Sequence, residues 1–167
     1  MAAKLERIDD IDGRLLDFLQ QDARMSNAAL ARELHMAPSA ILERIRKLEE
    51  RGLIRGYEAR LDAAALGWGL LAFVFVRTDE GLGPNRTAER LAAIPGVQEV
   101  HKVAGEDCYL VKVRVPDTQA LAALMRTKFG RIETIRSTRT TIVLETIKEE
   151  ARLPIGNGVE GETRERP

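Results

Sequence analysis

Three short stretches in the first 60 residues carry apolar residues at helical spacing. In the first stretch these residues are Ile8, Ile11, Leu15, Phe18 and Leu19. Asp9 or Asp10 stands where an N-cap belongs, and the pattern ends near Asp22. The sequence therefore predicts an amphipathic helix at this end of the chain.

A second and a third helix follow after short breaks. Ser26 is a suitable N-cap for the second helix. After a break over residues 35–38, where Pro38 fits the first helical turn, the third helix continues to about Arg51, and Gly52 stands where a C-terminal cap belongs. Three short helices with a tight second junction predict a helix-turn-helix unit over residues 1–61, ending in a short strand or small wing at 53–61.

Beyond a connector at residues 62–67, the pattern changes to that of strands. Branched and apolar residues dominate four segments, which are Trp68–Arg77, Val97–Ala104, Cys108–Val115 and Thr134–Lys148. Helical patterns lie between them at Asn85–Ala93 and Asp117–Phe129, the second closed by Gly130. The order strand, helix, strand, strand, helix, strand predicts a ferredoxin-like βαββαβ domain over residues 68–150, and hence an α+β protein.

The first of these strands is apolar on both faces. Its two alternating sets are Leu70, Ala72, Val74 and Val76 on one face and Leu71, Phe73 and Phe75 on the other. Four strands and two helices can cover only one face of the sheet, so we expect the same sheet from a second copy to cover the other in an isologous dimer. The alternative is that the amino-terminal domain or the tail packs there.

Composition is that of an ordinary folded soluble protein, with 44% hydrophobic and 31% charged residues. A single cysteine, Cys108, cannot form an intramolecular disulfide, and no secretory leader pattern or membrane-spanning stretch is evident, so we expect a cytoplasmic protein without a membrane role. Widely spaced histidines and one cysteine predict no metal site. We expect the polar segment 151–167 to be a disordered tail.

Charge is unevenly distributed although 26 basic and 26 acidic residues give a net charge of zero. Residues 1–22 carry three basic and six acidic side chains, whereas residues 23–60 carry eight basic and five acidic ones, a surplus of +3. The third helix lies within this basic stretch. Polyanion binding would therefore depend on local placement and on several copies acting together.

The third helix has an outer face suited to the major groove of double-stranded DNA. At 100° per residue, Ile41, Ile45 and Leu48 form the buried stripe. The candidate DNA-binding residues are Ser39, Ala40, Arg44, Arg46 and Lys47. The alternative is an ordinary solvated helix face, in which the acids Glu43 and Glu50 pair with the cations Arg46 and Lys47.

A glycine turn marks the second candidate site. In the run Gly105-Glu106-Asp107-Cys108-Tyr109, backbone N–H groups could face a carboxylate and an acid could receive an ammonium group. Read alone, the run is a hairpin turn between two strands. Cys108 is better explained as a small apolar residue than as a nucleophile, because no histidine adjoins it.

Taken together, these motifs resemble the Lrp/AsnC family, the leucine-responsive or feast/famine regulators. The resemblance rests on the helix-turn-helix residues 26–31, 38–49 and 52–57, on the turn 105–109 with the strand after it, and on Thr138-Arg139-Thr140 before residues 142–145. It covers roughly residues 5–150 in the expected order.

The resemblance implies a transcription regulator whose first domain binds DNA and whose second domain forms dimers that often assemble into octamers. A small effector, commonly an amino acid, would bind between dimers near the glycine turn, and no other cofactor is expected. Residue by residue, it implies effector contacts from Gly105, Asp107, Cys108, Tyr109, Thr138 and Thr140. Cys108 stands where several members carry aspartate, so the effector's identity stays open.

Two other functions are compatible with parts of the pattern. The same arrays could wrap DNA with little sequence preference, as a nucleoid-like architectural protein does. Haem-biosynthetic decarboxylases also resemble this two-domain family, but tetrapyrrole chemistry would need histidine and arginine anchors, and His101 has few arginines nearby in sequence. The sequence therefore favours an effector-modulated, sequence-specific DNA-binding regulator that is not an enzyme.

Overall fold

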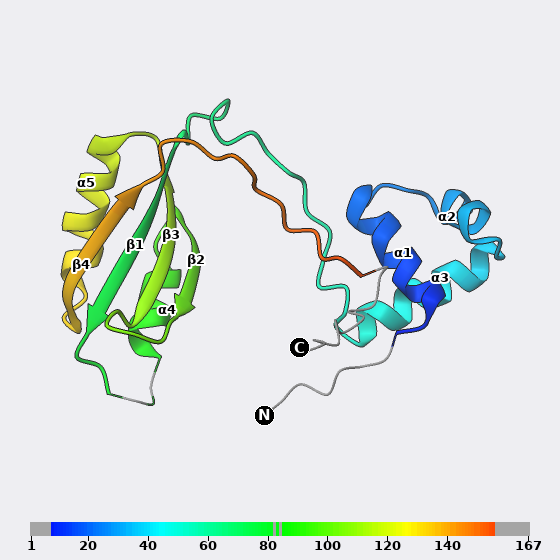
Figure 1. Ribbon diagram of the computed structural model, residues 1–167, viewed down its shortest axis with the longest axis horizontal. Coiled ribbons are helices and arrows are strands. Elements are labelled where there is room, and N and C mark those ends of the chain that lie inside the picture. Colours follow the sequence, from blue (N-terminus) through cyan, green and yellow to red (C-terminus); the bar gives the residue numbers. More distant parts are fainter. Residues whose placement is uncertain (1–7, 82, 84, 156–167) are drawn as a thin grey trace, which may run out of the picture. The chain divides into compact units, whose positions relative to one another are not determined.

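A computed structural model of the chain describes residues 8–81, 83 and 85–155. Its elements are α1 (Asp10–Gln21), α2 (Asn27–Leu34), α3 (Pro38–Glu50), β1 (Leu70–Thr78), α4 (Arg86–Ala92), β2 (Val97–Lys102), β3 (Tyr109–Val115), α5 (Thr118–Thr127), a 3-10 turn (Phe129–Arg131) and β4 (Ile135–Ile142). The chain divides into two compact units, one holding the residues up to Arg60 and from Glu150 onward, the other holding residues 61–149 (Figure 1).

The first unit is built on three helices whose caps follow the sequence signals. Asp9 accepts a hydrogen bond from the Asp12 backbone N–H at 2.7 Å, and the Ser26 hydroxyl accepts one from the Ala29 N–H at 3.1 Å. Both predicted N-caps are therefore confirmed. The helices bury a shared apolar core of Leu15, Leu16, Leu19, Leu30, Ala31, Leu34, Ile41, Ile45 and Leu48.

The junction between α2 and α3 is the tight turn of a helix-turn-helix. His35 ends α2 in the left-handed conformation, with φ of 54°, and Pro38 opens α3 three residues later. The Met36 N–H returns to the Ala31 carbonyl at 2.9 Å, which closes the end of α2. This turn fixes the direction in which α3 leaves α2.

The segment after α3 differs from the prediction of a strand or wing. Gly52, with φ of +70°, ends α3, and residues 53–61 form no strand. A strand needs a partner, and among its described residues this unit has none. Tyr57 instead donates a hydrogen bond to Glu49 at 3.0 Å, and burial together with this bond raises the pKa of Tyr57 to about 12.

The second unit is a four-stranded antiparallel sheet in the order β2-β3-β1-β4. Its core contains Leu91 of α4 and Leu121 of α5 with the inward residues of β1 and β3. Both helices therefore pack on one face of the sheet, which is the predicted ferredoxin-like arrangement (Figure 1).

The other face of the sheet lacks a helical cover and is partly apolar. Ala72, Val74 and Val76 are fully buried on the helix side. Phe73 and Phe75 on the opposite face are half-buried. The strand thus has the two apolar faces that its sequence pattern indicates. The second, called the open face below, carries no helix among the described residues, and Glu149 contacts Lys112 and Arg114 on it.

Several element ends differ from the expectation. β4 stops at Ile142, which pairs with Ala72, rather than at Lys148. One further backbone bond, from the Val143 N–H to the Leu71 carbonyl at 2.9 Å, follows the last pair. α5 ends at Thr127, so Gly130 lies in the 3-10 turn that follows.

The expected tail begins within the described part of the chain. Residues 151–155 lie against α1, to which Leu153 is hydrogen-bonded. Residues 156–167, the rest of that expected tail, lie outside the described residues.

Candidate DNA interface and effector site

The outer face of α3 carries the polar side chains that the sequence assigned to DNA. Ser39 is exposed and Ala40 half-buried at the first turn. The side chains of Arg46 and Lys47 are 70% and 63% exposed. Packing of Ile41 and Leu48 into the core leaves these groups facing solvent on the helix-turn-helix unit.

Both cations on this face have acidic partners one helical turn away. Arg46 Nε lies 2.9 Å from Glu50 Oε1, and Lys47 Nζ lies 3.5 Å from Glu43 Oε1. The ion pairs expected for an ordinary solvated helix face are therefore present. Exposed ion pairs of this spacing stabilise a helix by only about 0.3–0.5 kcal/mol. A DNA phosphate or base edge can therefore replace the carboxylate at a small cost in free energy.

Arg44 is used differently from its neighbours. Its Nη1 lies 2.8 Å from Asp9 Oδ2 and 2.7 Å from Asp12 Oδ1, and only 27% of the side chain is exposed. Hydrogen bonds to the two aspartates raise the pKa of Arg44. The pKa of Asp9 is lowered, mainly by the hydrogen bond from the Asp12 backbone N–H and next by the one from Arg44. Arg44 thus links α3 to the first turn of α1, a role that its helical position did not reveal.

The glycine turn lies between β2 and β3, and its acid is already paired. Gly105 has φ of +132°, in the region that favours glycine. Asp107 Oδ2 lies 3.3 Å from Arg139 Nη2, and the Arg139 guanidinium sits 3.9 Å from the ring centroid of Phe75. Arg139 was not among the predicted site residues, although it lies between Thr138 and Thr140.

Cys108 and Tyr109 point into the protein. The Thr78 backbone N–H donates to Cys108 Sγ at 3.5 Å, and hydrogen bonding to Thr78 lowers the pKa of the thiol. Tyr109 is 2% exposed, and its hydroxyl donates to Glu80 at 3.4 Å. Both side chains are therefore held by the core side of the sheet.

Thr138 and Thr140 lie on β4, an edge strand with both side chains exposed. Thr138 shares a row of the sheet with Val76 and Tyr109, which places it at the level of the glycine turn. Both threonines pair with core-facing residues of β1, so they lie on the helix side, whereas Arg139 lies on the open face. The six predicted effector residues thus gather at one end of the sheet but do not share one face in a single chain.

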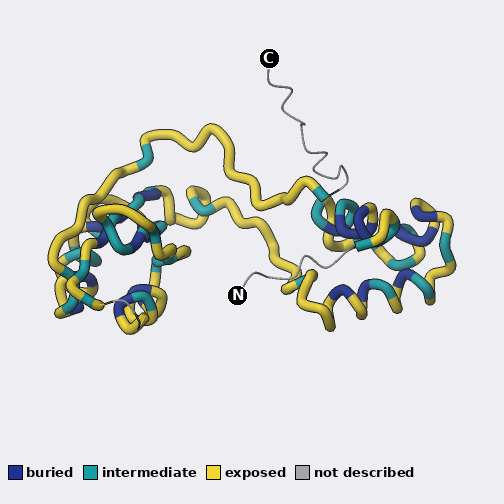
Figure 2. Tube along the Cα trace, turned by 60° about the horizontal axis from the view of Figure 1, so that its bottom comes forward, coloured by how far each residue is buried: buried dark blue, intermediate teal, exposed yellow. Residues whose placement is uncertain are grey.

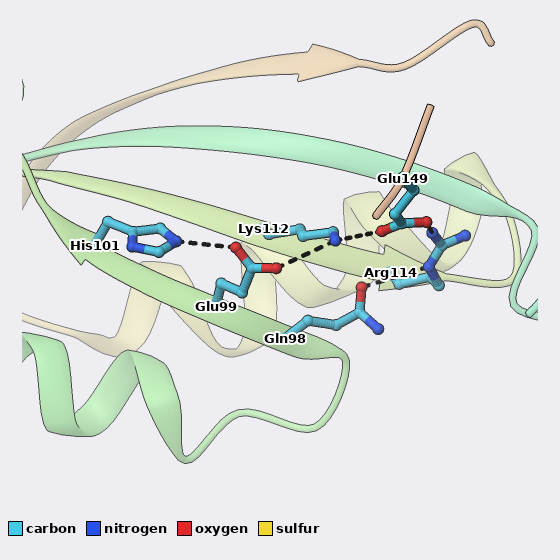
Figure 3. Close-up of polar contacts among 6 residues, drawn as sticks. All are labelled: Gln98, Glu99, His101, Lys112, Arg114 and Glu149. Atoms are coloured by element: carbon cyan, nitrogen blue, oxygen red, sulfur yellow. Dashed lines mark hydrogen bonds and ion pairs between the residues drawn. The ribbon is translucent and has the colours of Figure 1, made fainter. Parts of the chain in front are cut away.

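A polar cluster on the open face of the sheet was not predicted (Figure 3). Lys112 bonds Glu99 at 3.2 Å and Glu149 at 2.5 Å. Arg114 donates to Gln98, and His101 lies 2.9 Å from Glu99. The sequence does contain a signal for this cluster. Residues 112 and 114 are both cations two positions apart on a strand, so their side chains lie on the same face.

Neither metal-ligand groups nor membrane-spanning helices occur in the described ranges. Over these residues, no three or more histidine, cysteine, aspartate or glutamate side chains are grouped as metal ligands. In the same part of the chain, every helix is too short or too polar to cross a membrane.

Two family models match the chain in succession. The model of the AsnC-type helix-turn-helix domain matches residues 8–49, and the model of the Lrp/AsnC ligand binding domain matches residues 71–153. Among curated proteins, the leucine-responsive regulatory protein of Salmonella typhimurium is 38% identical over 151 residues, covering 89% of this chain and 92% of the relative.

Solved structures give the same picture. A transcriptional regulator from Neisseria meningitidis in complex with L-methionine has a TM-score of 0.82 and 27% identity, covering 89% of this chain and 97% of that chain. The feast or famine regulatory protein from M. tuberculosis complexed with L-methionine has a TM-score of 0.81 and 35% identity, covering 88% and 99%. Both domains of this chain therefore have counterparts in single regulators.

Proposed function

Because the chain belongs to the Lrp/AsnC family of transcription regulators, we propose that it binds operator DNA through α3 and that an amino acid controls this binding. The observation that carries the proposal is the outer face of α3, where the exposed cations Arg46 and Lys47 lie in the second half of a helix packed in a helix-turn-helix. Ser39, Arg46 and Lys47 contact DNA in this proposal, with Ala40 allowing close approach. Arg44 positions the helix.

The DNA-binding role is tested by replacing both exposed cations. Arg46→Ala with Lys47→Ala should weaken binding to the promoter of the protein's own gene. The slope of log affinity against log salt should also fall by about 1 for each phosphate that the variant no longer neutralises. Fluorescence anisotropy over a salt series measures both quantities.

A charge-matched variant separates this effect from a general change in net charge. Arg126→Ala with Lys128→Ala removes the same two charges from the sheet unit. It should leave affinity and salt slope as in the wild type. An unchanged slope in the α3 variant would reject α3 as the reading helix.

Copies of the chain associate through the open face of the sheet in this proposal. The half-buried Phe73 and Phe75 supply an apolar centre that a second copy of the face would bury isologously. Paired dimers, up to an octamer, would then present α3 helices to successive major grooves about 34 Å apart. A surplus of only +3 on residues 23–60 makes such multivalency necessary for useful affinity.

The effector binds at the sheet end that holds the glycine turn, in a site completed by a second copy. In this proposal Asp107 receives the ammonium group in exchange for Arg139, and the backbone at Gly105 faces the carboxylate. The exposed hydroxyls of Thr138 and Thr140 bond polar atoms of the effector. Cys108 and Tyr109 fix the backbone of the turn from inside. Methionine is the first effector to test, because two similar regulators were solved with it.

Isothermal titration with methionine tests this site. Thr138→Val and Thr140→Val should each weaken methionine binding by about fivefold, the usual worth of one hydrogen bond. Thr118→Val is the control, because Thr118 is exposed at the start of α5, outside both the predicted effector residues and the open face of the sheet. Equal losses in all three variants would place the effector elsewhere.

No catalytic step is assigned to any residue in this proposal. His101 is exposed and paired with Glu99, with no second histidine beside it in the contacts that the described residues make. A regulator of this kind acts at the nucleoid, and we place the protein in the cytoplasm accordingly.

A further inference from the structure

The chain carries a peptide segment seated on α1. The Leu153 N–H donates to Gln20 Oε1 at 2.7 Å, and Gln20 Nε2 donates to the Leu153 carbonyl at 3.0 Å. One side-chain amide thus satisfies both backbone groups of one residue. The Leu153 side chain is 66% exposed, so α1 recognises the backbone here rather than the side chain.

Two further contacts flank this pair of hydrogen bonds. Arg152 Nη2 lies 3.8 Å from Asp17 Oδ1. Ile155 packs on the core of the helix-turn-helix unit beside Gly13, where an added Cβ would lie 3.8 Å from the isoleucine methyl. Residues 13, 17 and 20 are spaced as one face of a helix, so the segment follows a single stripe of α1.

The chain is also anchored just before this segment. Glu149 bonds Lys112 and Arg114 on the open face of the sheet, and those two side chains are only 15% and 16% exposed (Figure 3). Arg152, only three residues later, belongs to the other unit. The connection at 149–152 is therefore held at both ends, whereas residues 51–69 form no helix or strand and are mostly exposed (Figure 2).

We propose that residues 149–155 form a strap that seats on α1 of the same chain and carries the effector signal from the sheet to the helix-turn-helix unit. The claim that the strap carries an effector signal rests on the proposed function. The claim that the strap binds α1 rests only on the contacts described above. An effector changes DNA binding only if the two states differ in free energy. The strap supplies such a difference when effector binding alters how Glu149 bonds Lys112 and Arg114, because Glu149 lies only three residues before Arg152, which contacts α1.

Seating is tested in the full chain by hydrogen exchange of peptides covering residues 150–155. Gln20→Met keeps the size of the side chain and removes both hydrogen bonds, so exchange of this segment should speed up about tenfold. Gln21→Met is the matched control, because Gln21 is exposed at the end of α1. Equal exchange in wild type and Gln20→Met would overturn the strap, as would protection that appears only at concentrations where copies associate.

Signal transfer is tested by DNA affinity with and without methionine. Gln20→Met should reduce the methionine-induced change in DNA affinity to half or less of the change measured for the control Gln21→Met. The affinity of both variants for methionine should be unchanged. Arg152→Glu, outside every helix and strand, should act in the same direction without risk to the fold of α1. An unchanged methionine response in both variants would overturn the relay.

The two proposals fail separately. A wild-type protein that neither binds promoter DNA nor binds methionine would count against the proposed function. The exchange experiment uses no ligand, so it decides the seating of residues 150–155 in either case.

Discussion

Arg44 illustrates how neighbouring residues decide what a single charged side chain does. It lies on the flank of α3 beside exposed Arg46 and Lys47, yet its guanidinium bonds two aspartates of α1. One of them, Asp9, is also the N-cap of α1. The same side chain therefore supports a cap and ties two helices together.

Arg44→Met should lower the free energy of unfolding by about 2 kcal/mol, because hydrogen bonds to charged groups are removed and two carboxylates are left together. Urea unfolding measures the change. Arg46→Met, which breaks only an exposed pair with Glu50, should cost less than about 0.5 kcal/mol. Equal costs for the two variants would contradict the structural role of Arg44.

The same ion pair has a pH signature. The pKa of Asp9 is lowered in the folded state, so its stabilisation is present above the ordinary aspartate pKa of 3.8 and is lost as the pH falls through the lower folded value. Wild-type protein should therefore lose more stability on acidification through this range than Arg44→Met does.

At the scale of elements, one junction decides what α3 can do. The turn after α2 places a histidine in the left-handed conformation, which costs non-glycine residues free energy. The turn directs α3 so that Ile41, Ile45 and Leu48 are buried and the opposite face stays in solvent. The strand β4, by contrast, keeps a free edge and exposed threonines because only β1 pairs with it.

His35→Gly should raise the free energy of unfolding by about 0.5–1 kcal/mol, because glycine adopts positive φ without strain. Thermal unfolding provides the measurement. His35→Ala is the comparison, since alanine keeps the strain and should bring no gain. A gain from alanine as large as that from glycine would show that the imidazole, not the backbone, is responsible.

At the scale of the whole molecule, the neutral total charge reflects unlike parts. The basic surplus of +3 on residues 23–60 is offset by an acidic surplus of the same size on residues 1–22, and the rest of the chain is balanced. A single copy has few cations to offer to DNA, and the open sheet face offers a means of association. Assembly and DNA binding should therefore be linked.

Phe73→Glu should prevent self-association, because it places a charge at the apolar centre of the open face. Sedimentation velocity should show the monomer, and DNA affinity should fall with it because multivalent binding is no longer possible. Gln119→Glu adds the same charge on exposed α5 and should change neither. A Phe73→Glu variant that still associates would exclude this face as the interface.

Sequence reasoning succeeded where the signal is local. The N-caps Asp9 and Ser26, and Gly52 just after α3, were recognisable because each depends on residues a few positions away. It failed for residues 53–61 and for the end of β4, where a strand requires a partner that the local pattern does not reveal. In the candidate sites, sequence reasoning selected Ser39, Arg46 and Lys47 from their helical spacing, and it did not select Arg139.

The sequence by itself determined the order of the elements, the buried stripe of α3 and the two apolar faces of β1, because periodicity and capping act within a few residues. Only the tertiary structure decided that Arg44 bonds Asp9 and Asp12, that Lys112 and Arg114 meet Glu149, and that Leu153 is bound by Gln20, 133 positions away. Those pairs depend on where the folded backbone brings distant residues together, which no local pattern records.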